Sequence, residues 1–173
     1  VFLDPDHTMP RLIKLPELLR AADAMSSDTD DDNYEAVTAI LNASPGSIGR
    51  ARPKTAMLGD DNRQLIAKFP HHEDAWDVMA WEATALDLAA AAGVLVPAHR
   101  LTRIDGRHLL LLDRFDRTVT TTAGSTALRI GYMSAMTLLG RRDGDSADYA
   151  DIAERLAEVS AEAKEDARQL FRR

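Results

Sequence analysis

The amino-acid sequence predicts an α+β protein in which helices precede a small antiparallel sheet and further helices follow it. Apolar residues recur at helical spacing near both ends of the chain. In the middle, two pairs of short apolar runs are each joined by a turn sequence, which is typical of β-hairpins. A long alanine-rich helical pattern separates the two pairs. Helices grouped around a sheet in this order indicate the α+β class.

The composition is that of one folded domain or two small lobes, with 173 residues of which 45% are hydrophobic and 28% charged. The chain has no cysteine, which excludes disulfides and thiolate metal sites. Its net charge of -7 argues against nonspecific nucleic-acid binding by the whole surface. No apolar run approaches the roughly 20 residues that cross a bilayer, and no signal peptide is evident, so we predict a cytoplasmic protein without membrane contact.

The first helix is predicted from Pro16 to about Ser26. Proline is tolerated in a first helical turn, and Glu17 suits the positive end of the helix dipole. A second helix is predicted from Asn33 to Asn42. The acidic run Asp28–Asp32 between them lacks the glycine and distal glutamate of an EF-hand, so we predict a solvated loop there.

The stretch from Ala43 to Pro70 predicts a phosphate clamp. A loop with small residues leads into a strand at Thr55–Leu58, and a turn then leads to a strand at Leu65–Phe69. Backbone N–H groups of a glycine-containing loop can approach phosphate oxygens closely, and Lys68 on the second strand can supply a positive charge. The stretch matches neither the P-loop nor the dinucleotide fingerprint, so an ordinary hairpin remains the alternative.

A long helix is predicted from Asp74 to Ala92, with Gly93 as its C-terminal cap. Its predicted buried stripe consists of Trp76, Ala80, Ala83, Leu86 and Ala90, widened by Met79 and Leu88. Glu82 lies among these apolar residues, and an exposed polar position is one reading of it. The adjacent His71 and His72 lack the spacing of a chelate, so we predict no metal site.

Two further strands are predicted at 94–103 and 108–115, around the turn Asp105-Gly106. Leu109–Leu112 is apolar on both faces, which indicates a central strand. Helices are then predicted at 132–139, 149–159 and 161–171.

Several segments match one known family in the same order along the chain. They are the loop Ser47–Lys54, Ile66–Pro70, Trp81-Glu82 with Leu88-Ala89 and Ala92–Val94, Leu112–Arg117, Tyr149, and Asp166–Phe171. In these segments the chain resembles the HipA-like serine/threonine kinases, the toxins of bacterial toxin–antitoxin pairs. The resemblance implies an N-terminal helical segment (1–43), a kinase-like ATP-binding N-lobe (44–117) and the start of a helical C-lobe (118–173).

The resemblance also implies roles for individual residues. ATP would be bound by the loop residues Ser47, Gly49 and Lys54, by Lys68 with Glu82 as its partner, and by a hinge of Asp113, Arg114 and Phe115 whose backbone meets the adenine. Ser47 occupies the position of the loop serine that members autophosphorylate. Arg50 replaces the second glycine of the family's loop, where it could hinder the approach of phosphate or neutralise its charge.

ATP and Mg²⁺ are the implied cofactors, and the implied substrate is a protein serine in an aminoacyl-tRNA synthetase or a translation factor. The implied partner is a helix-turn-helix antitoxin, through which alone the protein would contact DNA. The catalytic aspartate and the Mg²⁺ ligands are expected after Arg173, so we expect a fragment of a kinase that does not turn over by itself. The alternatives are a non-catalytic protein-interaction domain and a small-molecule phosphotransferase.

Overall fold

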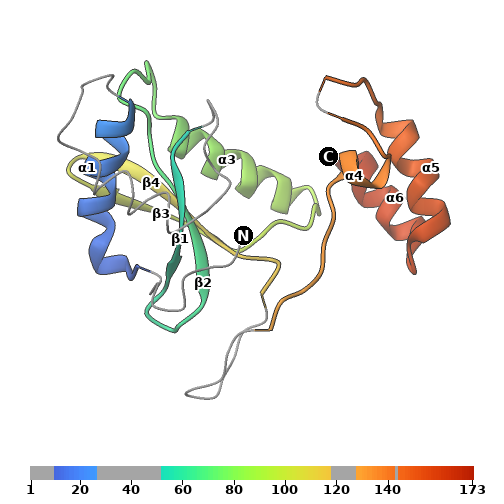
Figure 1. The fold of residues 1–173 in the computed structure, drawn as a ribbon, viewed down its shortest axis with the longest axis horizontal. Coiled ribbons are helices and arrows are strands. Elements are labelled where there is room, and N and C mark those ends of the chain that lie inside the picture. The colour runs from blue at the N-terminus through green and yellow to red at the C-terminus, as the bar shows by residue number, and fades with distance from the viewer. Residues whose placement is uncertain (1–9, 27–51, 118–127, 143) are drawn as a thin grey trace.

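A computed structural model describes residues 10–26, 52–117, 128–142 and 144–173. The predicted helix at 33–42, the acidic loop at 28–32 and the loop residues Ser47, Gly49 and Arg50 lie outside the described residues. Within the described ranges the protein combines helices with one antiparallel sheet (Figure 1). The mixed helix-and-sheet class is therefore confirmed, whereas the division into three segments and the kinase-like N-lobe stay predictions.

The sheet has four strands in the order β1-β2-β4-β3, and all neighbours are antiparallel. The strands are β1 (Lys54–Leu58), β2 (Gln64–Lys68), β3 (His99–Ile104) and β4 (Arg107–Asp113). The interior position predicted for the leucine-rich strand is confirmed, since β4 pairs with both β2 and β3. The turn between β3 and β4 has positive φ at both Asp105 (49°) and Gly106 (80°), as a tight two-residue hairpin requires.

The strand predicted to begin at residue 94 begins only at His99. Residues 94–98 instead connect the preceding helix to β3. The Val94 amide donates to the Ala89 carbonyl at 2.9 Å, and Pro97 has no amide to donate to a neighbouring strand.

Helix α1 (Leu15–Ser26) covers one face of the sheet, preceded by a single 3-10 turn, η1 (Leu12–Lys14). Its predicted range is confirmed. Its apolar side pairs with the strand residues that point toward it, because successive side chains of a strand alternate between faces. The resulting core contains Leu15, Leu18, Leu19, Ala21 and Ala22 from α1 together with Met57, Leu65, Ala67, Phe69, Leu109 and Leu111.

Helix α3 (Val78–Ala91) covers the opposite face of the sheet, mainly over β3 and β4. It begins four residues later than predicted, because the Asp77 carboxylate caps it by accepting from the Ala80 amide at 3.0 Å. Asp74, the predicted start, is occupied elsewhere: its carboxylate accepts from the His71 amide and pairs with Arg52.

The predicted buried stripe of this helix is wrong in part. Met79 and Ala83 are buried against Leu110 and Leu112, with Val78, Leu86 and Leu101 partly buried beside them. Trp76 lies before the helix begins and is 67% exposed, and Leu88 is 66% exposed. The buried side of α3 is therefore narrower than predicted and packs mainly on β4, with Leu101 of β3 at its edge.

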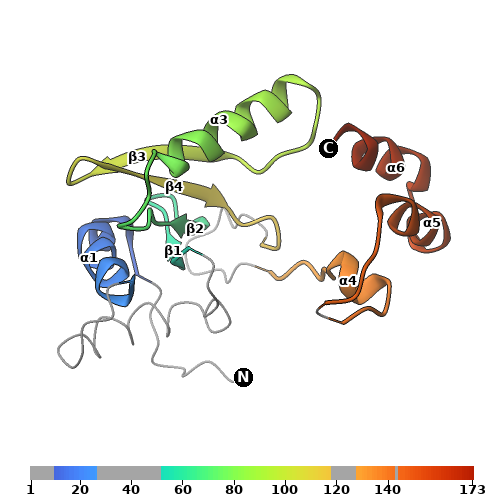
Figure 2. The ribbon, with the colours of Figure 1, turned by 90° about the horizontal axis from the view of Figure 1, so that it is seen from above.

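The last part of the chain forms three helices, α4 (Ala135–Leu138), α5 (Tyr149–Val159) and α6 (Ala163–Arg172) (Figure 2). The first is shorter than predicted because Ser134 caps it, accepting from the Thr137 amide at 3.1 Å. Helices α5 and α6 pack against each other. The Gln169 side chain of α6 accepts from the Leu95 amide at 3.2 Å, which ties these helices to the end of α3.

Candidate functional site

Lys68 lies at the end of β2, on the face of the sheet that α3 covers. It is in register with Leu110 of β4, a residue of the α3-side cluster, and its neighbour Ala67 points into the α1-side core. The ammonium group of Lys68 pairs with the carboxylate of Glu82 on α3, and each side chain is 32% exposed. The structure therefore places these two predicted site residues together in a half-buried ion pair.

Lys54 stands directly across from Lys68 in the register of β1 and β2. Residues that face each other in antiparallel strands have Cβ atoms about 4.5–5.5 Å apart, and like charges in such a pair repel. Two lysines in register on the same face therefore favour a site that receives an anion. Of the predicted ATP-binding residues, Lys54, Lys68 and Glu82 thus form one group.

The loop predicted to cover the phosphates ends at Lys54, which is the first residue of β1. Just before it, the Pro53 carbonyl accepts from the Phe69 amide at 3.0 Å, which fixes the entry to β1 beside the end of β2. Ser47 and Gly49 lie outside the described residues, so their predicted roles stay predictions.

The position of Glu82 depends on how α3 is anchored. Asp77 caps the helix and also accepts from the His108 ring of β4. Burial raises the pKa of Asp77, but the hydrogen bonds from His108 and the Ala80 amide outweigh it and hold that pKa below its usual value. The buried Met79 and Ala83 then fix the rotation of the helix, so that Glu82 reaches past the edge of the buried stripe to β2.

The predicted hinge lies at the other end of the sheet. Asp113, the last residue of β4, is in register with Leu65, and Lys68 is three residues further along β2. At a rise of roughly 3.4 Å per residue the two ends are about 10 Å apart, so the hinge does not contact the lysines.

The hinge side chains already have partners within the protein. Asp113 pairs with Arg63 at 3.1 Å, and Arg114 donates to both oxygens of Asp116 at 2.8 and 2.6 Å. Phe115 is 65% exposed and meets Tyr132 edge-on with 5.1 Å between ring centroids.

Two of the three hinge amides are also occupied. The Asp113 amide donates to the Ala98 carbonyl at 2.8 Å, and the Arg114 amide donates to the Gln64 carbonyl at 3.0 Å. Among the described residues, no hydrogen bond is formed by the Phe115 amide. A ligand that meets this backbone would therefore use Phe115 as its donor.

Sequence reasoning missed the buried ionic cluster behind the hinge. Asp116 is 5% exposed and pairs with both Arg114 and Arg117, and Arg117 also donates to the Gln64 side chain at 3.1 Å. The hydrogen bond from Arg114, acting against burial, holds the pKa of Asp116 below its usual value. The alternation of arginine and aspartate in residues 114–117 was the available signal, since an aspartate between two arginines is well placed to pair with them.

One of three comparisons with known proteins found a match. The family model of the HipA-like C-terminal domain matches residues 46–173, which is most of the chain. The chain belongs to this family. The resemblance stated from the sequence is therefore confirmed, and the HipA-like domain contains every described residue of the candidate site, while α1 precedes it.

The comparison with curated proteins and the comparison with solved structures each gave no match. Among the described residues of this HipA-like protein, no helix combines the length and the apolar character needed to cross a membrane.

Proposed function

We propose that this HipA-like protein binds ATP on the α3 side of its sheet, with the triphosphate at Lys54 and Lys68 and the adenine at Phe115. The observation that carries the proposal is the Lys68–Glu82 ion pair beside a second lysine in register across the strand. Protein kinases use a strand lysine paired with a helix glutamate for the same purpose.

The ion pair suits phosphate binding because Glu82 positions the ammonium group of Lys68 without using all of its hydrogen-bond donors. A lysine ammonium has three hydrogens, of which Glu82 takes up one, so further hydrogens can be donated to phosphate oxygens. The β2 backbone and the carboxylate of Glu82 together restrict where the ammonium lies. Restricting it before the ligand arrives lowers the entropic cost of binding.

By family resemblance, we propose further that the bound ATP serves transfer of its γ-phosphoryl group to a serine hydroxyl of a protein, with Ser47 as the autophosphorylated residue. The proposed substrates are an aminoacyl-tRNA synthetase or a translation factor, and the proposed partner is a helix-turn-helix antitoxin that mediates contact with DNA. Phosphate on Ser47 in mass spectra of protein incubated with ATP and Mg²⁺ supports this, whereas modification of a metabolite instead favours a small-molecule phosphotransferase.

Magnesium would neutralise charge on the phosphates of bound ATP. Among the described residues, no group of three or more histidine, aspartate or glutamate side chains lies close enough to hold a metal ion. We assign no magnesium ligand in this part of the chain and derive no step through the metal.

The binding proposal is tested by comparing ATP with adenosine. Lys68→Met keeps the length of the side chain and removes its charge. We expect it to weaken ATP binding by about 1–3 kcal/mol, which is roughly 5- to 150-fold, and to leave the weaker binding of adenosine unchanged. Isothermal titration calorimetry measures both ligands.

Lys14→Met is the matched control, because Lys14 lies in η1 and its one ion pair with a described residue is with the nearby Glu17. It should leave ATP binding unchanged. Equal ATP affinity of the unaltered protein and Lys68→Met would contradict the proposal and favour a protein-interaction domain.

A further inference from the structure

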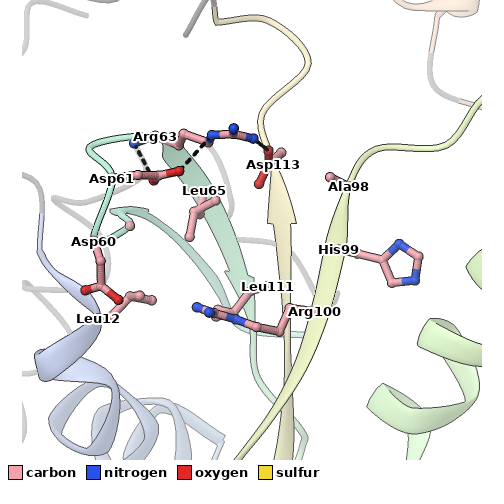
Figure 3. A pocket seen from close by; sticks show the side chains of 11 residues that line it. Leu12, Asp60, Asp61, Arg63, Leu65, Ala98, His99, Arg100, Leu111 and Asp113 are labelled. Atoms are coloured by element: carbon pink, nitrogen blue, oxygen red, sulfur yellow. Dashed lines mark hydrogen bonds and ion pairs between the residues drawn. The ribbon is translucent and has the colours of Figure 1, made fainter. Parts of the chain in front are cut away.

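A pocket lies on the opposite face of the sheet from Lys68 (Figure 3). Its volume is about 370 Å³, which is within the range of small-molecule sites. Its apolar floor is formed by Leu12 of η1, Leu65 of β2 and Leu111 of β4. The last two belong to the α1-side core, whereas Lys68 lies on the α3 side, so the sheet separates this pocket from the candidate nucleotide site.

The charged residues around the pocket divide into two kinds. Arg63 is fully engaged, since it pairs with Asp61 at 2.8 Å and with Asp113 at 3.1 Å. The side chains of Asp60 and Arg100 have no hydrogen bond or ion pair with any residue that the structure describes, and they do not pair with each other. The side chain of Arg100 extends along Leu111 toward Leu12 and Asp60 (Figure 3).

The direction of Arg100 follows from the strand register. Arg100 is in register with Leu111, so both side chains point to the α1 side of the sheet. The preceding residue, His99, points away and is held by Asp87 of α3 at 3.1 Å. The arginine is thereby placed over an apolar floor with its guanidinium available and an unpaired carboxylate on the far side.

We propose that this pocket binds a small zwitterion of the amino-acid type, with its carboxylate on Arg100, its ammonium group on Asp60 and its apolar side chain on Leu65 and Leu111. A guanidinium binds a carboxylate through two parallel hydrogen bonds, which makes arginine the suitable receptor for that group. An apolar body between two opposite charges matches the leucine floor between Asp60 and Arg100. The inference goes beyond nucleotide binding and does not depend on it.

The test uses L-leucine as the probe, with two analogues that each lack one charge. N-acetyl-L-leucine has no ammonium group, and L-leucinamide has no carboxylate. Titration followed by ¹H–¹⁵N NMR should show saturable binding of L-leucine, with shifts at Leu65 and Leu111. Each analogue should bind at least about fivefold more weakly, as expected for loss of one charge-assisted contact at an open site.

Two variants assign the contacts. Arg100→Gln should reduce the affinity for L-leucine to that for L-leucinamide, and it should leave the affinity for L-leucinamide unchanged. Asp60→Asn should reduce the affinity for L-leucine to that for N-acetyl-L-leucine, and it should leave the affinity for N-acetyl-L-leucine unchanged. The control is Arg103→Gln, on the same strand but on the opposite face, which should leave all three affinities unchanged.

Both site residues are exposed, so the variants are expected to fold, and their thermal unfolding checks this. The proposal is overturned if L-leucine shows no saturation at millimolar concentration, if the three probes bind equally, or if the shifts cluster at Lys68 and Glu82. Failure of ATP binding in the Lys68→Met comparison leaves this test unaffected, because Lys68 and this pocket lie on different faces of the sheet.

Discussion

The two faces of the sheet differ in what they carry. On the α1 side, the strands contribute only apolar residues to a core of eleven buried residues, including Leu19 and Phe69 with no exposed surface. On the α3 side, only four residues form the buried cluster, and the same face carries Lys54, Lys68 and Glu82. The difference teaches that the large core under α1 mainly stabilises the sheet, with Arg100 exposed beside it, whereas on the α3 side an ion pair adjoins a much smaller buried cluster.

This division is encoded by alternation along single strands. Ala67 and Lys68 are adjacent in sequence, yet one lies in the core and the other in an ion pair. A lysine in place of Ala67, which has no exposed surface, would bury an uncompensated charge, which is strongly unfavourable. The charges of the candidate site can therefore be removed at small cost in stability, whereas the buried apolar residues of the other face cannot.

The largest expected effect is at the centre of the α1-side core. Phe69→Ala should lower the free energy of unfolding by about 4 kcal/mol, because it leaves a cavity where a fully buried ring has been. Urea unfolding measures the change. Phe171→Ala is the control: Phe171 is 92% exposed, so its replacement should change stability by less than about 0.5 kcal/mol. Equal losses of stability in Phe69→Ala and Phe171→Ala would show that the α1-side core does not stabilise the protein as described.

The next effect concerns Asp116, a charged side chain that is buried near the end of the sheet. Asp116→Asn should lower the free energy of unfolding by about 3 kcal/mol, because Arg114 and Arg117 lose their shared carboxylate. Glu158→Gln removes an exposed partner of Arg155 and should cost about 0.5 kcal/mol or less. A similarly small loss in the free energy of unfolding for Asp116→Asn would mean that the cluster of Arg114, Asp116 and Arg117 does not stabilise this part of the fold.

The same cluster makes stability depend on pH. The pKa of Asp116 is lowered in the folded protein by the hydrogen bond from Arg114, so the folded state binds its proton less tightly than the unfolded state does. Its contribution is therefore present above the unfolded pKa of about 3.9 and is lost as pH falls through the lower folded pKa. The free energy of unfolding should be measured from about pH 6 down to about pH 3, a range that spans this pKa. It should fall more steeply for the unaltered protein than for Asp116→Asn. Parallel curves would contradict this assignment.

The smallest expected change in stability is at the candidate site itself. Lys68→Met should alter the free energy of unfolding by no more than about 1 kcal/mol, because its ion pair is about one-third exposed and partly screened by solvent. A loss comparable to that of Phe69→Ala would show that the α3 side is structural as well. Urea unfolding in the absence of nucleotide makes the comparison.

Much of the fold could be predicted because local patterns decide it. The range of α1 follows from its apolar spacing, and the interior position of β4 follows from four consecutive leucines. The start of α3 could not be predicted, because Asp74 and Asp77 are both suitable caps. The choice depends on Arg52 and His108, which only the folded chain brings to them.

The candidate site was predicted less completely, for the same reason. The pairing of Glu82 with Lys68 came from family resemblance, since nothing local in the helix distinguishes Glu82 from an exposed glutamate. The pocket beside Arg100 was not predicted at all. It is lined from η1, the turn after β1, and strands β2, β3 and β4, and sequence patterns do not reveal which distant segments meet.

The central claim, that the Lys54 and Lys68 side of the sheet receives the phosphates of ATP, can be tested by direct labelling. The chain has four lysines, at positions 14, 54, 68 and 164, and an acyl phosphate of ATP acylates the lysine that lies nearest its terminal phosphate. Mass spectrometry should find the label on Lys68 or Lys54, and excess ATP should suppress it there. Label on Lys14 and Lys164 to the same extent, with no protection by ATP, would contradict the account.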